Sequence, residues 1–527
     1  MILYIFIATF YLALNAALRH DVQMFQQNSY RYSRYFKWLN SNLWSELFKV
    51  FILLAFTITA IIAESYAGLP GLSLCIILAM CGFVRVAIVE FKKKFKVKLA
   101  YTDRVKRLLF TSLLLPTLIF GVAYLHLDYV QFVVVSVVVV AFSNLILLLA
   151  NLINTPLEAA ITAWYINDAR KIIASRKDLI IIGVTGSYGK TSTKNYLYRM
   201  LTEKYNVLVT PGNYNTLLGV VRTIREQLRP QHQVFIVEMG AKQRGDIKEI
   251  CDLVHPSIGI VTSVGEAHLE TFKSVENIQK TKFELIDSLP KNGFGVVNFD
   301  SANIKSFDYK SPCPIVGYSI EEPTASVRAV QVSYNASGVS FAMNVNGSEV
   351  AFSSPLLGGG NVLNLMAGIV VSAELEVGAN LLQRAIKQLQ PVEHRLSMSR
   401  AGGLTILDDA YNSNPAGAKM ALDVLRDFTR SEGAKRVVIT PGFVEMGASQ
   451  AEANYTLGCQ IAASADYAVV VNRHNREAIV RGLVDSKFSK SSYFVAESLQ
   501  EAREHLATRL NAGDILLYEN DLPDSFK

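Results

Sequence analysis

The sequence contains few cysteines and has no Cys-x-x-Cys pair. The five cysteines are odd in number, and two of them fall within one apolar segment. A disulfide framework or a structural zinc site needs paired or clustered cysteines, so the sequence argues against both. Reduced thiols in a cytosolic compartment fit this pattern best. The cysteines are Cys75, Cys81, Cys251, Cys313 and Cys459.

The sequence also lacks a basic face in its polar part, although its formal net charge is +7. Much of the basic excess lies between apolar segments, above all in the lysine-rich stretch 92–98. A nucleic-acid partner would require the basic residues to cluster on the soluble portion. The charge distribution therefore indicates membrane topology and predicts no nucleic-acid partner.

Long apolar runs dominate the first 155 residues. Five of them reach the roughly 20 residues that a helix needs to cross a bilayer. The first run has no basic segment before it and no small-residue cleavage site, so we interpret it as a membrane span and not as a signal peptide. The predicted spans are 1–18, 47–64, 69–89, 108–126 and 129–151.

The basic loops predict how these spans are oriented. The loop after the first span and the loop after the third carry the lysines and arginines, and basic loops face the cytoplasm. The N-terminus is then outside, and everything after Asn151 is cytoplasmic, which predicts a multi-pass protein of the cytoplasmic membrane with lipid as a partner. Charged residues near span ends, such as Lys49 and Glu90, are interpreted as snorkelling to the interface. The membrane region as a whole is interpreted as an anchor.

The polar part begins with a phosphate-binding pattern. Residues 179–184 form an apolar run typical of a buried parallel strand, followed by Thr-Gly-Ser-Tyr-Gly-Lys-Thr-Ser-Thr at 185–193 and a helical pattern. A strand, a glycine loop and a helix N-terminus together can hold a triphosphate. Lys190 would reach the β and γ phosphates, and the Thr191 hydroxyl would bind Mg²⁺. The predicted ATP-binding residues of the loop are Gly186, Ser187, Gly189, Lys190, Thr191 and Ser192.

A second apolar strand, 234–238, ends in Glu238. Strands of a doubly wound sheet present functional groups at their C-terminal ends, so Glu238 is placed to hold Mg²⁺ opposite the loop. Short alternating runs over 313–356 predict an appended antiparallel sheet. After about residue 391, strands and helices alternate without a Gly-x-Gly-x-x-Gly loop, which predicts a small Rossmann-like domain without a dinucleotide site.

The phosphate-loop motif at 185–194 resembles the ATP loop of the Mur ligase family. The motif Asp408-Asp409-Ala-Tyr411-Asn412-Ser-Asn414-Pro415 is similar to the MurF branch, which adds D-alanyl-D-alanine to cell-wall precursors. The resemblance covers about residues 180–520. It implies a fold with an N-terminal α-helical membrane region, 1–155, followed by α/β domains: a P-loop central ATP-binding domain, 156–390, and a Rossmann-like C-terminal domain, 391–527.

The resemblance also implies roles for individual residues. Two Mg²⁺ ions would be held by Thr191, Glu238, His268 and an N-carboxylated (carbamylated) Lys282, and Lys190, Lys282, His268 and Arg395 would form the catalytic group. Asn298 would contact the adenine, Arg395 the γ-phosphate, and Asp409 the nucleotide. The expected substrate contacts are Asn213, Asn215, Thr216 and Asn414.

Five departures from the family pattern stand out. Gly360 replaces a histidine, and His394 stands where glycine is usual. Residues 441–447 and 519–524 differ from the family in the domain that receives the amino component. The apolar spans occupy the place of the family's UDP-binding domain.

These residues together predict an ATP-dependent amide ligase that works through an acyl phosphate, with a cell-wall precursor and an amino acid or dipeptide as substrates. Three alternatives remain open. One is a related amide ligase acting on a lipid-linked precursor or a poly-amino-acid chain. The others are an ATP-driven membrane transporter, against which the absence of an ABC signature argues, and a catalytically inactive membrane scaffold.

Overall fold

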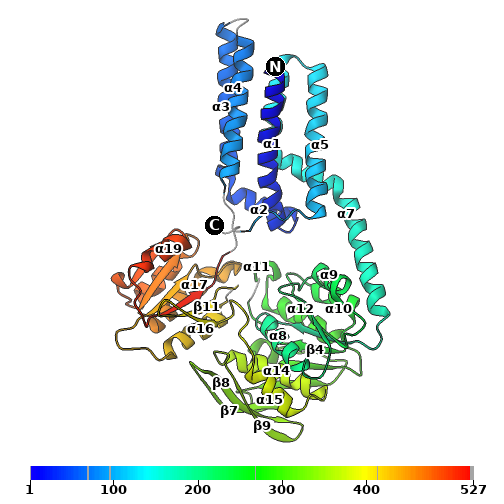
Figure 1. Ribbon diagram of the computed structural model, residues 1–527, viewed down its shortest axis with the longest axis vertical. Coiled ribbons are helices and arrows are strands. Elements are labelled where there is room, and N and C mark those ends of the chain that lie inside the picture. Colours follow the sequence, from blue (N-terminus) through cyan, green and yellow to red (C-terminus); the bar gives the residue numbers. More distant parts are fainter. Residues whose placement is uncertain (1, 68–70, 94–96, 267–268, 412–413, 523–527) are drawn as a thin grey trace. The chain divides into compact units, whose positions relative to one another are not determined.

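The computed structural model describes residues 2–67, 71–93, 97–266, 269–411 and 414–522 (Figure 1). The chain divides into two compact units, one reaching from the N-terminus to Trp164 and the other from Tyr165 to Leu522. Each unit is described by itself.

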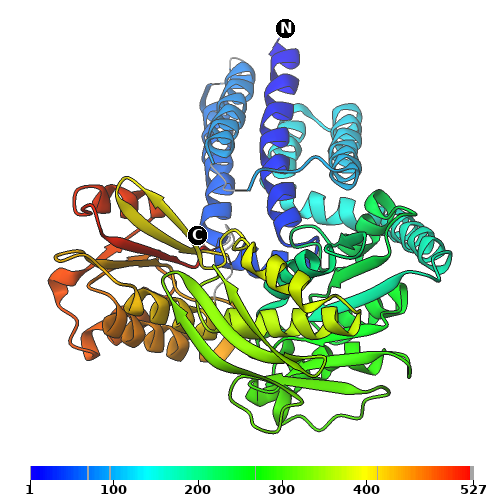
Figure 2. The ribbon, with the colours of Figure 1, turned by 60° about the horizontal axis from the view of Figure 1, so that its bottom comes forward.

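Helices are the only regular secondary structure in the described residues of the first unit. Helices α1, α3, α4 and α5 run lengthwise beside one another (Figures 1 and 2). Thr102 caps α5 by accepting from the Val105 amide, and Asp128 caps α6 through a capping box with Gln131. The helices are α1 (Ile2–Gln27), α2 (Tyr32–Ser41), α3 (Leu43–Ala67), α4 (Gly71–Lys92), α5 (Asp103–His126), α6 (Tyr129–Ala141) and α7 (Ser143–Ala174).

In the described part of the chain, three helices are long and apolar enough to cross a membrane: α1, α5 and α7. A fourth is possible if α2 and the start of α3, which meet at a bend of 73°, count as one broken span. Helix α4 covers the third expected span, and its crossing stays a prediction.

The expected single span over 129–151 is wrong, because the chain breaks at Phe142 between α6 and α7. Phe142 has φ of −108° and ψ of 34°, outside the helical range, so α6 ends there. The snorkelling interpretation is also wrong for Lys49 and Glu90, which are only 3% and 6% exposed.

The second unit contains a nine-stranded sheet of order β2-β3-β1-β4-β5-β6-β7-β8-β9. The strands from β2 to β7 pair in parallel, and β7, β8 and β9 form antiparallel pairs. The antiparallel sheet expected over 313–356 is therefore confirmed for β7 to β9 and wrong for β6, which extends the parallel part of the sheet. The strands are β1 (Ile180–Thr185), β2 (Val207–Val209), β3 (Val234–Glu238), β4 (Ile258–Val261), β5 (Phe294–Asn298), β6 (Ile315–Ser319), β7 (Val327–Asn335), β8 (Gly338–Val345) and β9 (Ser348–Ser354).

Helices cover both faces of this sheet, with one apolar core on each side. One core contains residues of α8, α14 and α15, and the other contains residues of α9, α10 and α12 together with the end of α7. Burial on both faces explains why the central strands are continuous apolar runs. The helices are α8 (Lys190–Leu201), α9 (Leu217–Gln227), α10 (Asp246–Val254), α11 (Leu269–Phe272), α12 (Val275–Asp287), α13 (Ala302–Lys305), α14 (Gly360–Glu374) and α15 (Ala379–Lys387).

A six-stranded sheet of order β10-β11-β15-β12-β13-β14 follows. Its strands pair in parallel except for the antiparallel edge strand β10, which confirms the predicted Rossmann-like pattern. The strands are β10 (Ser397–Ala401), β11 (Leu404–Asp409), β12 (Arg436–Thr440), β13 (Tyr467–Val471), β14 (Tyr493–Ala496) and β15 (Ile515–Glu519). The helices are α16 (Pro415–Asp427), α17 (Gln450–Ser464), α18 (Arg476–Asp485) and α19 (Leu499–Ala507), with short 3₁₀ turns at Gly447–Ser449 and Lys490–Ser492.

Candidate active site

The glycine loop joins β1 to α8 and depends on two glycines. Gly186 has φ of 150°, and a Cβ there would lie 2.1 Å from the Thr262 hydroxyl oxygen. Gly189 has φ of 79° at the N-cap of α8, and its Cβ would lie 2.4 Å from Asn364 Oδ1. Any side chain at either position would therefore displace the loop.

The loop is held in place by the segment after β4. The Ser187 amide donates to the Ser263 carbonyl at 2.8 Å, and the Tyr188 amide donates to the Ser263 hydroxyl at 2.8 Å. The Gly265 amide donates to the Ser187 hydroxyl at 2.9 Å. This hydroxyl is therefore engaged in holding the loop. These bonds fix the position of the loop, and they occupy the amides of Ser187 and Tyr188.

Lys190 directs its ammonium group into the curve of the loop. Its Nζ donates to the carbonyl oxygens of Gly186 at 2.6 Å and Ser187 at 3.1 Å. Burial lowers the pKa of Lys190 to about 8, while Glu238 opposes the shift and Arg395 adds to it. A bound phosphate would supply the negative charge that this site lacks and would keep the ammonium protonated.

Glu238 ends β3 beside the loop and is 1% exposed. Its Oε1 accepts from the Thr191 hydroxyl at 3.1 Å and from Asn215 Nδ2 at 3.0 Å. Burial raises the pKa of Glu238, but the attraction of Lys194 and Lys190 outweighs it, so the net pKa is lowered. An ionised carboxylate next to a hydroxyl is an oxygen donor set that suits a hard cation such as Mg²⁺.

Lys194 is a site residue to which sequence reasoning gave no role. Its Nζ lies 3.0 Å from Glu238 Oε2 and donates to the carbonyls of Thr210 at 3.0 Å and Gly212 at 2.8 Å. The helical spacing contained a signal, because Lys194 shares the buried face of α8 with Leu197 and Leu201. A lysine on a buried helix face requires a partner.

The predicted substrate residues have different surroundings. Asn215 touches Glu238, whereas Asn213 is exposed and Thr216 caps α9 by accepting from the Gly219 amide at 3.4 Å. Asn414 caps α16, since its Oδ1 accepts from the Gly417 amide at 2.9 Å. The structure thus brings Asn215 to the candidate metal ligands and gives Thr216 and Asn414 capping bonds.

Lys282 and Lys280 on α12 have opposite environments. Lys282 is 3% exposed, and its Nζ lies 5.9 Å from the centre of the Phe272 ring. Burial and the nearby Lys190 lower the pKa of Lys282 to about 7, against the attraction of Asp246 and Glu284. Lys280 forms an exposed ion pair with Glu276. His268, the other predicted metal ligand, lies outside the described residues.

Arg395 and Asp409 meet where β11 ends. Asp409 Oδ1 accepts from the Leu396 amide at 3.0 Å, and the Arg395 guanidinium lies 4.6 Å from the centre of the Tyr411 ring. Burial raises the pKa of Asp409 to about 6, and Arg395 opposes this rise. His394 has φ of 59°, which explains why a glycine is usual at this position, and its Nδ1 lies 2.7 Å from Asp408 Oδ2.

Two asparagines link other elements to the site. Asn298 donates to the Thr262 carbonyl at 2.9 Å and accepts from the Asp300 amide at 3.0 Å, so it ties β5 to β4. The adenine contact expected of it stays a prediction. Asn364, to which we gave no role from the sequence, accepts from the Thr193 hydroxyl at 3.2 Å. At Gly360, a Cβ would lie 2.7 Å from Met420 Sδ, so a histidine there would require Met420 to move.

The fold and the site define a class: an α/β protein with a phosphate loop on its central sheet and a Rossmann-like domain behind it. Residues 184–372 match the Mur ligase middle domain, and residues 394–518 match the Mur ligase glutamate ligase domain. The chain therefore belongs to the Mur ligase family.

The chain is similar to several enzymes named UDP-N-acetylmuramoyl-tripeptide–D-alanyl-D-alanine ligase. It is 32% identical to that of Mycobacterium tuberculosis over 250 residues, which are 47% of this chain and 49% of the relative. It is 29% identical to that of Bacillus subtilis over 276 residues, 51% of this chain and 57% of the relative. The chain thus spans about half the length of the curated relatives it matches.

Two solved structures of MurF ligases are similar to this chain. The MurF ligase of Thermotoga maritima in complex with ADP is 25% identical, with a TM-score of 0.60 over 68% of this chain and 80% of that one. MurF of Acinetobacter baumannii has the same fold, with a TM-score of 0.59 at 24% identity over 67% of this chain and 76% of that one.

Proposed function

We propose that this chain is an ATP-dependent, amide-forming ligase of the MurF kind. The observation that carries the proposal is the joint placement of Lys190 inside the glycine loop and of Glu238 on the Thr191 hydroxyl. The solved relative that contains ADP and the curated relatives named as D-alanyl-D-alanine ligases support the same reading.

The proposed reaction has two steps. A carboxylate oxygen of the first substrate attacks the γ-phosphorus of ATP, the bond to the β-phosphate oxygen breaks, and an acyl phosphate and ADP form. The amine of the second substrate then attacks the acyl carbon, loses a proton, and expels inorganic phosphate. Lys190 and Arg395 supply positive charge where the phosphoryl group is transferred, and no side-chain nucleophile is needed.

The residues at the end of β3 fit a divalent cation. Thr191 and Glu238 would hold one Mg²⁺, and this ion would neutralise charge on the phosphate oxygens. A second Mg²⁺ would be held by His268 and the carbamate of Lys282. The Thr191 hydroxyl and the Glu238 carboxylate lie next to the phosphate loop, which is where an ATP-bound ion is required.

The environment of Lys282 supports the proposed carbamate. A neutral amine reacts with CO₂ to give the carbamate anion and one proton, so the reaction needs an amine that is easily deprotonated. Lys282 is buried, and its pKa is lowered to about 7. Lys280, two residues earlier, is instead exposed and forms an ion pair with Glu276.

We further propose that the helical unit anchors the ligase in the cytoplasmic membrane, with the catalytic domains in the cytoplasm. Three apolar helices of sufficient length and the basic loops support this placement. The helical unit also favours a second candidate for the acceptor, a lipid-linked precursor in place of a UDP-linked one, because its described residues form no α/β nucleotide-binding domain.

A substrate panel tests the proposal. The full chain in detergent is given ATP, Mg²⁺ and D-alanyl-D-alanine, with UDP-N-acetylmuramoyl-tripeptide or a lipid-linked tripeptide as acceptor. We expect ADP release that requires both substrates and is lost in Lys190→Ala. ADP release without any acceptor, or at an unchanged rate in Lys190→Ala, would overturn it.

A further inference from the structure

Six ionisable side chains gather inside the helical unit, at one end of α1, α3 and α4. This is the end that carries the basic segment 92–98. Five of the six are at most 6% exposed, which is rare for charged groups unless they are paired. The six are His20 and Asp21 near the end of α1, Glu46 and Lys49 near the start of α3, and Glu90 and Lys93 around the end of α4.

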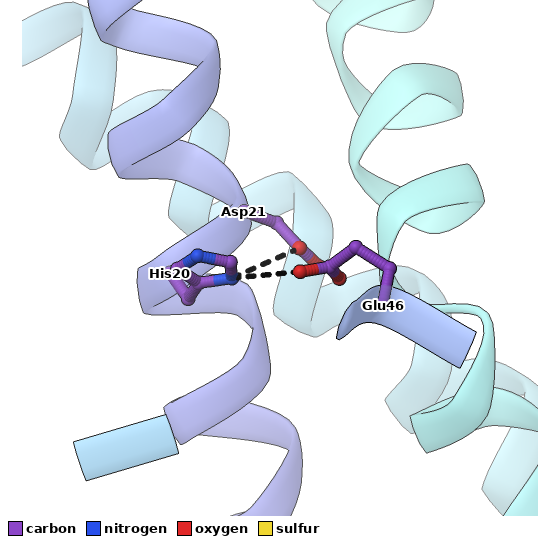
Figure 3. A group of neighbouring side chains, drawn as sticks. All are labelled: His20, Asp21 and Glu46. Carbon is purple, nitrogen blue, oxygen red and sulfur yellow. Dashed lines mark ion pairs between the residues drawn. The ribbon is translucent and has the colours of Figure 1, made fainter. Parts of the chain in front are cut away.

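The imidazole of His20 is surrounded by carboxylates. Its Nδ1 lies 3.7 Å from Asp21 Oδ1, 3.8 Å from Glu46 Oε1 and 3.4 Å from Glu90 Oε2. Figure 3 shows His20, Asp21 and Glu46 pointing toward one another, and their ligand atoms all lie within 4.8 Å of each other. Ligand atoms that share one ion with bonds of about 2.1 Å lie roughly 3 to 3.5 Å apart, so a small inward shift would complete such a site.

Asp21 has an oxygen that points into this cluster without a hydrogen-bond partner. The side chain is 0% exposed, and its Oδ2 accepts from the Ser143 hydroxyl at 2.6 Å. Within the described residues, Oδ1 has no hydrogen bond, and the nearest ammonium, on Lys49, is 3.6 Å away. A buried carboxylate oxygen without a hydrogen bond is costly, and a cation bound beside it would offset this cost.

Lys93 occupies the place that a cation would take. Its Nζ lies 3.0 Å from Glu90 Oε2, 3.5 Å from Glu46 Oε1 and 3.5 Å from His20 Nδ1. His20 Nδ1 therefore lies within reach of one ammonium and three carboxylates, and an imidazole nitrogen is a common metal ligand. Lys93 is 23% exposed, the most of the six, so it can leave the cluster toward solvent.

The charges favour an exchange of Lys93 for a divalent ion. The formal charges of the three carboxylates and the two lysines add to one net negative charge. If a divalent cation replaces the Lys93 ammonium, the cluster becomes neutral. Neutrality stabilises a buried cluster, because an uncompensated buried charge is strongly destabilising.

We propose that His20, Asp21, Glu46 and Glu90 form a binding site for a divalent transition-metal ion of the Mn²⁺ or Zn²⁺ class. One imidazole and several carboxylates are the ligands that these ions accept. Lys93 holds the site until the ion enters. Because the ligands come from α1, α3 and α4, the bound ion links these three helices and stabilises the membrane unit.

Equilibrium dialysis of the full chain tests this proposal. The protein in detergent is stripped with chelator, saturated with ADP and Mg²⁺, and dialysed against micromolar MnCl₂ or ZnCl₂. We expect His20→Ala and Glu90→Gln each to bind one ion fewer per chain than the wild type. Asp103→Asn serves as control, since its carboxylate is 79% exposed and pairs with Lys106, and it should bind as the wild type does.

Lys93→Met separates a metal site from a purely structural ion-pair network. Removal of the competing ammonium should tighten binding about tenfold and increase the rise in melting temperature that the metal produces. The proposal is overturned if the wild type, Glu90→Gln and Lys93→Met bind the same number of ions with the same affinity. It is also overturned if Lys93→Met melts at a lower temperature and gains no stability from either metal.

Discussion

Lys194 Nζ lies 3.0 Å from Glu238 Oε2, and both side chains are 1% exposed. This buried ion pair joins α8 to the end of β3 beside the phosphate loop. The other two bonds of Lys194, to the carbonyls of Thr210 and Gly212, join the same helix to the turn that carries Asn215. One lysine therefore fixes the carboxylate that we propose binds metal, together with the adjacent asparagine turn.

The first prediction concerns this pair. Lys194→Met should lower the free energy of unfolding by about 3 kcal/mol, because it leaves a buried carboxylate without its cation. Lys280→Ala is the matched control, since its exposed pair with Glu276 should contribute about 0.5 kcal/mol or less. Denaturant unfolding of the full chain measures both. Equal losses in the two variants would contradict the assignment, and adding Glu238→Gln to Lys194→Met should recover part of the loss.

The second prediction is a pH dependence at Asp409. Burial raises the pKa of its carboxyl from 3.8 to about 6, so the folded state binds the proton more tightly than the unfolded state does. The stability from this group is complete below pH 4 and is lost as the pH rises through about 6. Between these pH values the free energy of unfolding of the wild type should fall by an amount on the order of 2 kcal/mol, and Asp409→Asn should not show this fall. Unfolding curves that respond to pH equally in both proteins would contradict this.

The third prediction concerns the proposed carbamate. Lys282→Ala should nearly abolish ligation, and short-chain carboxylates should partly restore it by offering the missing oxygen ligand to Mg²⁺. Lys280→Ala should have little effect, because this residue lies on another face of α12 at roughly 200°. Initial rates with and without added formate or acetate measure the difference. If Lys280 proved essential and Lys282 dispensable, the assignment would be reversed.

The fourth prediction is that the catalytic domains lie in the cytoplasm. A reporter that is active only in the cytoplasm, fused after Lys527, should be active, because the basic loops around Arg34 and Lys93 face inward. A second fusion in the short loop at Asp128 should be inactive. If only the Asp128 fusion were active, the predicted orientation would be contradicted. The catalytic domains would then lie outside the cytoplasm, away from ATP.

Local sequence patterns predicted the central fold well. The apolar run 179–184 became β1 at Ile180–Thr185, and the Asn-Pro pair became the start of α16 at Pro415. Both features are determined by residues adjacent in the sequence: an apolar run forms the strand, and a capping asparagine followed by proline starts the helix. The link between Glu238 and the Thr191 hydroxyl could also be anticipated, because parallel strands place their C-terminal ends at one edge of the sheet.

Long-range pairings could not be read from the same patterns. Glu46 and Glu90 are charges near the ends of apolar runs, where snorkelling is the ordinary outcome, and only the packing of three helices brings them to His20. Lys194 on α8 likewise pairs with Glu238 at the end of β3, which is distant in the sequence. The break at Phe142 was missed because a count of apolar residues does not register where one apolar helix ends and the next begins.

The central claim is that ATP activates a carboxylate as an acyl phosphate. With the acceptor carboxylate labelled with ¹⁸O, the phosphate released by the full chain should carry one ¹⁸O atom, since the carboxylate oxygen that attacks phosphorus leaves with it. Mass spectrometry of the phosphate measures this directly, with Lys190→Ala as the variant that should release none. Phosphate free of the label, or label found in AMP, would contradict the account.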